Sequence, residues 1–145
     1  MSPLLRYTLL LLLLFAQFKS FTWAAPAIPV MSDKTEIEVE IFAAKGKYLL
    51  LWFASAPGFH ERHRQVAQQL ALHGYESWQV DLTDALFLPR GSQSLRKITG
   101  KYVAELINQA QHKTGKTIIL VSNSYGAIPV LRGAYQWQSQ KPDSA

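Results

Sequence analysis

The sequence predicts a three-layer α/β/α fold built around a mainly parallel β-sheet. Apolar runs typical of buried strands alternate with segments of helical periodicity along most of the chain. Turn-forming residues separate the two kinds of segment. Because a strand followed by a helix returns to the sheet as a parallel neighbour, this order favours a parallel sheet with right-handed crossovers. Functional residues are then expected where the strands end at their carboxyl side.

Two strands are predicted over residues 35–42 and 48–54. In the first, glutamates alternate with β-branched apolar residues, and this period of two is typical of a half-exposed strand. The second is a continuous apolar run, as expected of a strand buried on both faces. Gly46 marks the turn between them, so the two strands are able to pair as a hairpin.

The rest of the chain continues the alternation of helix and strand. Helical periodicity and apolar runs predict a helix over 61–73, a strand over 75–82, a helix over 100–111, a strand over 116–122 and a helix over 126–135. Gly74 follows the first helix as a C-terminal cap. The segment with Pro89 and Gly91 is expected to be a loop.

The first 24 residues are typical of a secretory signal peptide. Arg6 precedes an apolar run that includes six consecutive leucines, and small residues follow the run. Small residues three positions and one position before the cut fit cleavage after Ala24 and also after Ala27, and Ala24 is preferred because Pro26 lies beside the second cut. An uncleaved inner-membrane anchor is the other interpretation. Gln17 and Lys19 interrupt the run, however, short of the roughly 20 apolar residues that a spanning helix needs.

Either interpretation predicts export, to the periplasm or to the medium. Residues 1–24 could then touch the membrane transiently, residues 25–34 form a loose lead-in, and residues 35–145 form the domain.

Composition excludes several classes of protein. The chain has 145 residues, 48% of them hydrophobic and 17% charged, which is typical of one folded domain rather than a disordered chain. It has no cysteine, so disulfides, thiolate-bound metals and a thiol nucleophile are excluded. The net charge of +5 comes with no basic run, so nucleic acid is not an expected partner. No cofactor is expected.

The strongest chemical signal follows the predicted strand over 116–122. Ser124 stands between a buried strand and a helix, with Ser122 two residues before it and Gly126 two residues after it. Small residues at these two positions are what a nucleophile elbow needs, because its sharp turn holds the serine in a strained conformation. The backbone N–H of Tyr125 would then lie at a helix N-terminus and face a developing oxyanion. A turn serine that merely caps the helix is the alternative.

This arrangement resembles the N-terminal half of the α/β-hydrolase family, up to and including the elbow. The resemblance implies a partial α/β-hydrolase fold and a serine hydrolase that cleaves an ester, thioester or amide through an acyl-enzyme on Ser124. The turn at residues 55–58 takes the place of the family's oxyanion loop, so Ala56 is the second expected N–H donor. Ser122 stands where the family more often has glycine.

The family's acid and histidine would follow the nucleophile, and here one acid, Asp143, and no histidine follow it. We therefore expect a truncated hydrolase, weakly active or inactive as written. The alternative is a non-catalytic binding or partner-dependent module that uses the same crevice for an unknown small-molecule or acyl ligand. The open sheet edge left by missing strands would offer a route to a homo-oligomer.

The histidines that precede Ser124 are weak candidates for other chemistry. His60 and His63 are three residues apart, not the four of the zinc-binding HExxH helix, and no third ligand is evident, so no metal site is expected. His73 and His112 are expected at helix ends, where the helix dipole favours them. Asp81 is expected to order the loop that follows it.

Overall fold

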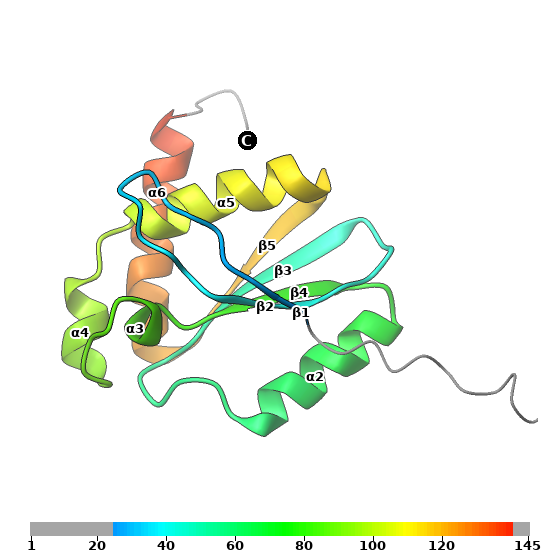
Figure 1. Ribbon diagram of the computed structural model, residues 1–145, viewed down its shortest axis with the longest axis horizontal. Coiled ribbons are helices and arrows are strands. Elements are labelled where there is room, and N and C mark those ends of the chain that lie inside the picture. The colour runs from blue at the N-terminus through cyan, green and yellow to red at the C-terminus, as the bar shows by residue number, and fades with distance from the viewer. Residues whose placement is uncertain (1–24, 141–145) are drawn as a thin grey trace, which may run out of the picture.

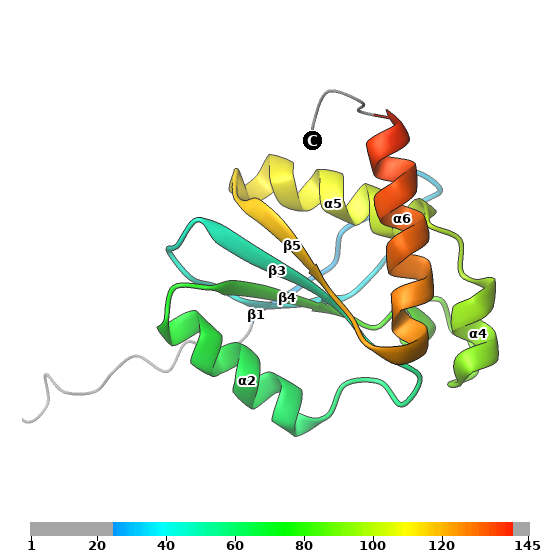
Figure 2. The same cartoon turned by 180° about the vertical axis from the view of Figure 1, so that it is seen from behind.

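The computed structural model describes residues 25–140, which form one mixed five-stranded sheet with helices on both faces (Figures 1 and 2). The strands are β1 (Ala25–Ala27), β2 (Val39–Phe42), β3 (Tyr48–Phe53), β4 (Glu76–Val80) and β5 (Thr117–Val121), in the spatial order β1-β2-β4-β3-β5. The segment predicted as a signal peptide lies outside the described residues.

The helices are α2 (Glu61–Leu72), α3 (Leu82–Ala85), α4 (Ser92–Lys97), α5 (Lys101–Thr114), the single 3-10 turn η1 (Ser124–Gly126) and α6 (Ala127–Gln140). Helix α2 covers one face of the sheet, whereas α5 and α6 pack together on the other (Figure 2). The predicted α/β/α layering is confirmed. The parallel part of the sheet comprises β3, β4 and β5.

The hairpin between the first two predicted strands does not form. β2 pairs antiparallel with β4, with Glu40 opposite Gln79, and β3 pairs with the far edge of β4 in parallel, with Leu51 opposite Trp78. The reason is burial: every residue of β4 is buried, so this strand needs a neighbour on each edge. β2 itself is shorter than predicted, because residues before Val39 contribute a single bridge, from Glu36 to Val30.

The lead-in is more ordered than predicted. Ala25–Ala27 pairs antiparallel with β2 as an outer strand. Further on, the Ser32 hydroxyl and backbone N–H both donate to the Glu105 carboxylate at 2.7 Å. Asp33 accepts hydrogen bonds from Lys101 at 2.9 Å and from Tyr102 at 3.0 Å. These contacts join the lead-in to α5.

The loop predicted around Pro89 and Gly91 contains two short helices, α3 and α4 (Figure 1). The carboxylate of Asp81 begins α3 by accepting hydrogen bonds from the N–H groups of Thr83 and Asp84, which is helix capping. The predicted loop-ordering role of Asp81 agrees with this contact.

The core lies between the sheet and α5. Leu49, Leu51 and Phe53 of β3 are buried at 0–1% exposure, whereas the alternate residues of β3 are half-buried. β3 is therefore buried fully on one face, not on both as predicted, because α2 packs chiefly against β4 and β2 on the other. None of the helices among the described residues is long and apolar enough to span a bilayer.

Candidate active site

The candidate site lies where β3 and β5 end side by side. The two strands are parallel neighbours, with Trp52 opposite Val121, so the turns that follow them emerge at the same edge of the sheet. Residues 54–58 follow β3 and residues 122–126 follow β5. The fold thus brings together the two turns that the sequence marked as oxyanion loop and elbow.

Ser124 occupies the conformation that an elbow requires. Its φ is +51°, a left-handed conformation that non-glycine residues rarely adopt. The preceding Asn123 is extended, with φ −137° and ψ 160°, and the turn continues through η1 directly into α6. Ser124 is exposed, and its Oγ makes no hydrogen bond to any other residue in the range 25–140. The strand–turn–helix context predicted for Ser124 is therefore present, whereas its role as nucleophile stays a prediction.

The small residues on either side of Ser124 are needed for close packing. A Cβ on the buried Gly126 would lie 2.5 Å from the Ala54 carbonyl oxygen and 2.5 Å from Ser122 Oγ. The Ser122 hydroxyl donates a hydrogen bond to the Phe53 carbonyl at 3.2 Å, which links the elbow to the end of β3. Serine thus fits where the family more often has glycine, because its hydroxyl has an acceptor beside it.

Two backbone N–H groups at this edge are available as donors. Within the described residues, neither the N–H of Tyr125 nor that of Ala56 donates to a protein acceptor. The turn that carries Ala56 is closed by the Gly58 N–H, which donates to the Ser55 carbonyl at 2.9 Å. Preorganised N–H donors with no internal partner are what an oxyanion hole needs. The assignment of these two groups to an oxyanion hole stays a prediction.

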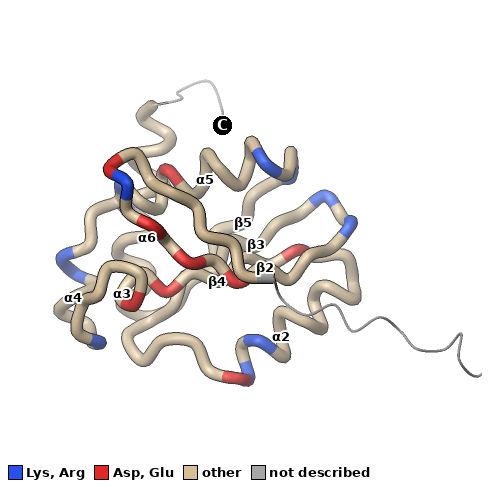
Figure 3. Tube along the Cα trace, in the orientation of Figure 1, with Lys and Arg blue, Asp and Glu red and all other residues tan. Residues whose placement is uncertain are grey.

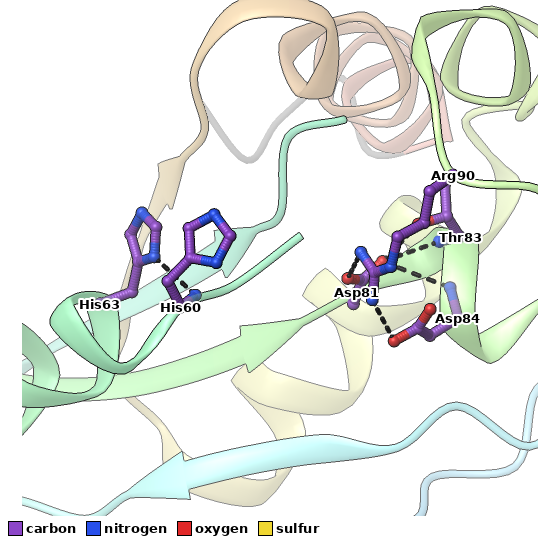
Figure 4. A network of polar contacts seen from close by, with 6 residues as sticks. All are labelled: His60, His63, Asp81, Thr83, Asp84 and Arg90. Carbon is purple, nitrogen blue, oxygen red and sulfur yellow. Dashed lines mark hydrogen bonds and ion pairs between the residues drawn. The ribbon is translucent and has the colours of Figure 1, made fainter. Parts of the chain in front are cut away.

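An arginine that the sequence analysis did not single out fixes the turn after β3. The Arg90 guanidinium donates to Asp81 Oδ2 at 2.9 Å and also pairs with Asp84 (Figure 4). Gly58 has φ +82°, and a Cβ there would lie 2.0 Å from Arg90 Nη1. The hydrogen bond to Asp81 is the main cause that raises the pKa of Arg90 above its usual value. Arg90 therefore connects the turn after β3 with the loop after β4.

His60 and His63 lie at the start of α2 (Figure 4). The His60 backbone N–H donates to His63 Nδ1 at 2.9 Å, which helps to fix the orientation of the His63 ring. The ring of His63 packs edge-on against Trp52 at 5.6 Å and against Phe59 at 5.5 Å. No group of three or more metal-ligating side chains comes together within residues 25–140. His63 is thus a packed aromatic and helix-start residue.

Helix α4 covers one side of the elbow. The Arg96 guanidinium lies over the Tyr125 ring, 4.9 Å from its centre, a cation–π contact. Arg132 of α6 donates to the carbonyls of Arg96 and Ile98, at 2.7 and 3.0 Å. These contacts hold α4 against the start of α6, next to the proposed donor at Tyr125.

The solved structures that are similar in fold to this chain include the following two. One is described as an α/β-hydrolase fold protein of unknown function, with a TM-score of 0.59 at 14% identity over 77% of this chain and 38% of that chain. The other is brefeldin A esterase, a bacterial homologue of human hormone-sensitive lipase, with a TM-score of 0.51 at 14% identity over 85% of this chain and 39% of that chain. No family model matches the sequence, and the search of curated proteins found no match.

The chain therefore has part of the α/β-hydrolase fold, and the predicted resemblance is confirmed at the level of fold. It spans less than two-fifths of the length of these two structures. At this identity the likeness shows the fold alone, and chemistry has to be argued from the site.

Proposed function

We propose that this chain carries the nucleophile half of a serine hydrolase site, with Ser124 attacking an ester, thioester or amide carbonyl. The observation that supports this proposal best is the positive φ of Ser124, held between a buried Gly126 and a hydrogen-bonded Ser122. The strand before Ser124 was expected to be buried, but β5 is an edge strand with half-buried and exposed residues. A strained and exposed serine in the turn between a parallel strand and a helix is what an elbow presents to substrate.

In this proposal the Ser124 side chain and two backbone N–H groups have separate roles. The Oγ of Ser124 forms a bond to the carbonyl carbon, while the N–H groups of Tyr125 and Ala56 donate to the oxygen that becomes negative. The Oγ proton has to pass to a general base, a group that no side chain hydrogen-bonded to Ser124 within residues 25–140 supplies, and from that base to the leaving group, whose bond to the carbonyl carbon breaks to give the acyl-enzyme. Water hydrolyses the acyl-enzyme and restores the hydroxyl.

A fluorophosphonate probe tests the proposal, because it forms a covalent bond with an activated serine. We expect labelling of the full chain at Ser124, located by mass spectrometry, and loss of the label in Ser124→Ala. Ser92→Ala, which changes a serine that lies outside the elbow, serves as the matched control and should keep the label. A folded wild-type chain that takes no label, or a Ser124→Ala variant labelled like the wild type, would refute the nucleophile.

A non-catalytic binding module is the second candidate. It is favoured by one observation: within residues 25–140 no side chain accepts a hydrogen bond from Ser124 Oγ, so no base activates it there. A serine without a base is a weak nucleophile. Failure of labelling together with reversible binding of an acyl ligand, lost in Tyr125→Pro, would select this candidate.

We also propose that the chain is exported, with residues 1–24 acting as a signal peptide. Cleavage after Ala24 would leave β1 intact, whereas cleavage after Ala27 would remove the strand that pairs with β2. Cell fractionation with N-terminal sequencing tests this. An N-terminus at Ala25 in an exported chain agrees with it, and an intact cytoplasmic chain contradicts it.

A further inference from the structure

A concave site lies away from the elbow. A cleft of about 820 Å³ opens between β2, the start of α2 and the segment that contains α3. Its lining includes the glutamates at alternate positions from Glu36 to Glu40, Gln79 of β4, residues at the start of α2, and part of the segment from Asp81 to Arg90, and none of the elbow residues lines it. A cleft of this size is within the range that small-molecule sites occupy.

Acidic residues recur along the trace beside β2 (Figure 3), and the residues that line the cleft carry an excess of negative charge. Five carboxylates line it, against two arginines. Arg64 is paired with Glu40 at 2.9 Å, and Arg90 is paired with Asp81 and Asp84. Glu36 and Glu38 remain, and neither makes an ion pair with another residue of the described chain. Two uncompensated carboxylates therefore face the cleft.

Strand geometry places these carboxylates together. Ile37 and Val39 are fully buried at 0% exposure, so the residues that alternate with them in the chain point to the opposite face. That face carries Glu36, Glu38 and Glu40 in one row. Because alternate side chains of an extended segment are roughly 7 Å apart, a single cationic group can approach two neighbouring carboxylates.

Beside this row of glutamates lies a buried side-chain amide whose oxygen accepts no hydrogen bond. Gln79 lies opposite Glu40 in the sheet and lines the cleft, with 3% of its surface exposed. Its Nε2 donates to the His63 carbonyl at 3.0 Å, which fixes the orientation of the amide. Its Oε1 accepts no hydrogen bond from the described residues. A buried acceptor without a partner is costly, so it favours a ligand that brings an N–H donor.

Aromatic and apolar groups form the rim of the same cleft. Phe87 is 96% exposed, although phenylalanine is usually buried, and its φ of +52° is a rare backbone conformation for an aromatic residue. Phe59, which precedes α2, lines the same cleft. Aromatic faces attract both apolar chains and cations.

We propose that this cleft binds an organic cation, a primary ammonium group attached to an apolar chain. The ammonium has three N–H donors, which serve the carboxylate of Glu38 and the free Oε1 of Gln79, the residue opposite Glu40 in the sheet, while Glu36, farther along the row, adds negative charge. The apolar chain lies against Phe87 and Phe59. A metal ion is the poorer match, because within residues 25–140 no three acidic or histidine side chains are grouped to hold one. The site does not depend on the chemistry proposed for Ser124.

Binding of hexylamine to the full chain, measured by isothermal titration calorimetry at pH 7 and low salt, tests the proposal. We expect hexylamine to bind more tightly than hexanol or hexanoate. Hexyltrimethylammonium, which has the charge but no N–H, is expected to bind more weakly than hexylamine. Raising the salt concentration should weaken the binding, because both carboxylates are exposed.

Two variants locate the site. The double change Glu36→Gln and Glu38→Gln should weaken hexylamine binding by about threefold to tenfold, the range expected for two exposed ion pairs. Phe87→Gly should weaken it as well, without loss of the fold, because glycine accepts the positive φ.

The control variants remove a carboxylate and an apolar side chain that do not line the cleft. Glu61→Gln removes a carboxylate of α2, and Leu72→Ala removes an apolar side chain that is 73% exposed. Both should leave the affinity unchanged. Equal affinity for hexylamine and hexanol, or an affinity that the double variant leaves unaltered, would overturn the proposal.

Discussion

At the scale of single residues, the elbow shows how a strained residue is kept in place. A non-glycine residue at φ near +50° costs roughly 1–3 kcal/mol, and the surrounding structure has to hold it there. Around Ser124 that support comes from Ser122, which is bonded to the end of β3, and from Gly126, which packs against Ala54. The strained residue, Ser124, and the two residues that hold it, Ser122 and Gly126, are thus alternate residues of one turn.

Gly126→Ala should destabilise the chain by about 1–3 kcal/mol, because the added Cβ meets backbone atoms that cannot move aside easily. The nearest of these is the Ala54 carbonyl oxygen at 2.5 Å. Chemical denaturation measures the change. Gly115→Ala is the control, because its added Cβ has no atom within 4 Å and the cost comes from φ alone. A Gly126→Ala variant as stable as the wild type would contradict this packing argument.

The strained turn at Ser124 could be predicted from sequence because it is local. Ser122, Ser124 and Gly126 lie within five consecutive positions, and the strand before them and the helix after them have clear periodicities. The contact between Arg90 and Gly58 could not be predicted from the sequence. Their contact joins two loops that are separated by α2 and β4, and neither residue has a local pattern that names its partner.

At the scale of elements, the helices α2 and α5 and the strands β3, β4 and β5 could be predicted from periodicity to within a few residues. Which strands are neighbours could not. The hairpin prediction was wrong because pairing depends on how buried each strand is. The buried β4 lies between β2 and β3 and pairs with both. α3 was missed because a single side chain, Asp81, begins it.

The attachment of the lead-in to α5 should depend on pH. The hydrogen bond from Lys101, and then those from Thr35, hold the pKa of Asp33 well below its usual range. A lowered folded-state pKa means that the stabilisation is complete above the unfolded value, near pH 4, and is lost as the pH falls further.

Asp33→Asn should therefore lower the thermal midpoint at pH 7 and have progressively less effect below about pH 4. Thermal unfolding at several pH values measures both chains side by side. High salt should reduce the difference at pH 7, because the ion pair is exposed. A difference between the two chains that grows as the pH falls would contradict the assignment.

At the scale of the whole molecule, the sheet has one edge without protection. β5 is the last strand in the order found within residues 25–140. It contains no charge and no proline, and Ile119 on it is 41% exposed. Strands at sheet edges usually carry charged residues or proline, because an edge without them is a template for pairing with another chain.

We predict that the chain self-associates through this edge. Ile119→Lys should shift the protein toward monomer, because two lysines cannot lie side by side at a paired edge without repulsion. Sedimentation velocity over a range of concentrations measures the shift. Leu72→Lys, which adds the same charge to an exposed position on α2, should leave the association unchanged. Equal association of the wild type and Ile119→Lys would rule out this edge as the interface.

The strand order also constrains the order in which the chain can assemble. β2 precedes β3 in the chain, yet its partners are β1 and β4, and β4 comes only after β3 and α2. A chain that emerges from the ribosome therefore holds β1 and β2 without their main neighbour until Val80 has been made. Two strands joined to each other alone are marginally stable in water. Synthesis of the first half of the chain thus leaves its apolar strand faces exposed for a time, and this interval is when a nascent chain of this topology is most vulnerable to aggregation.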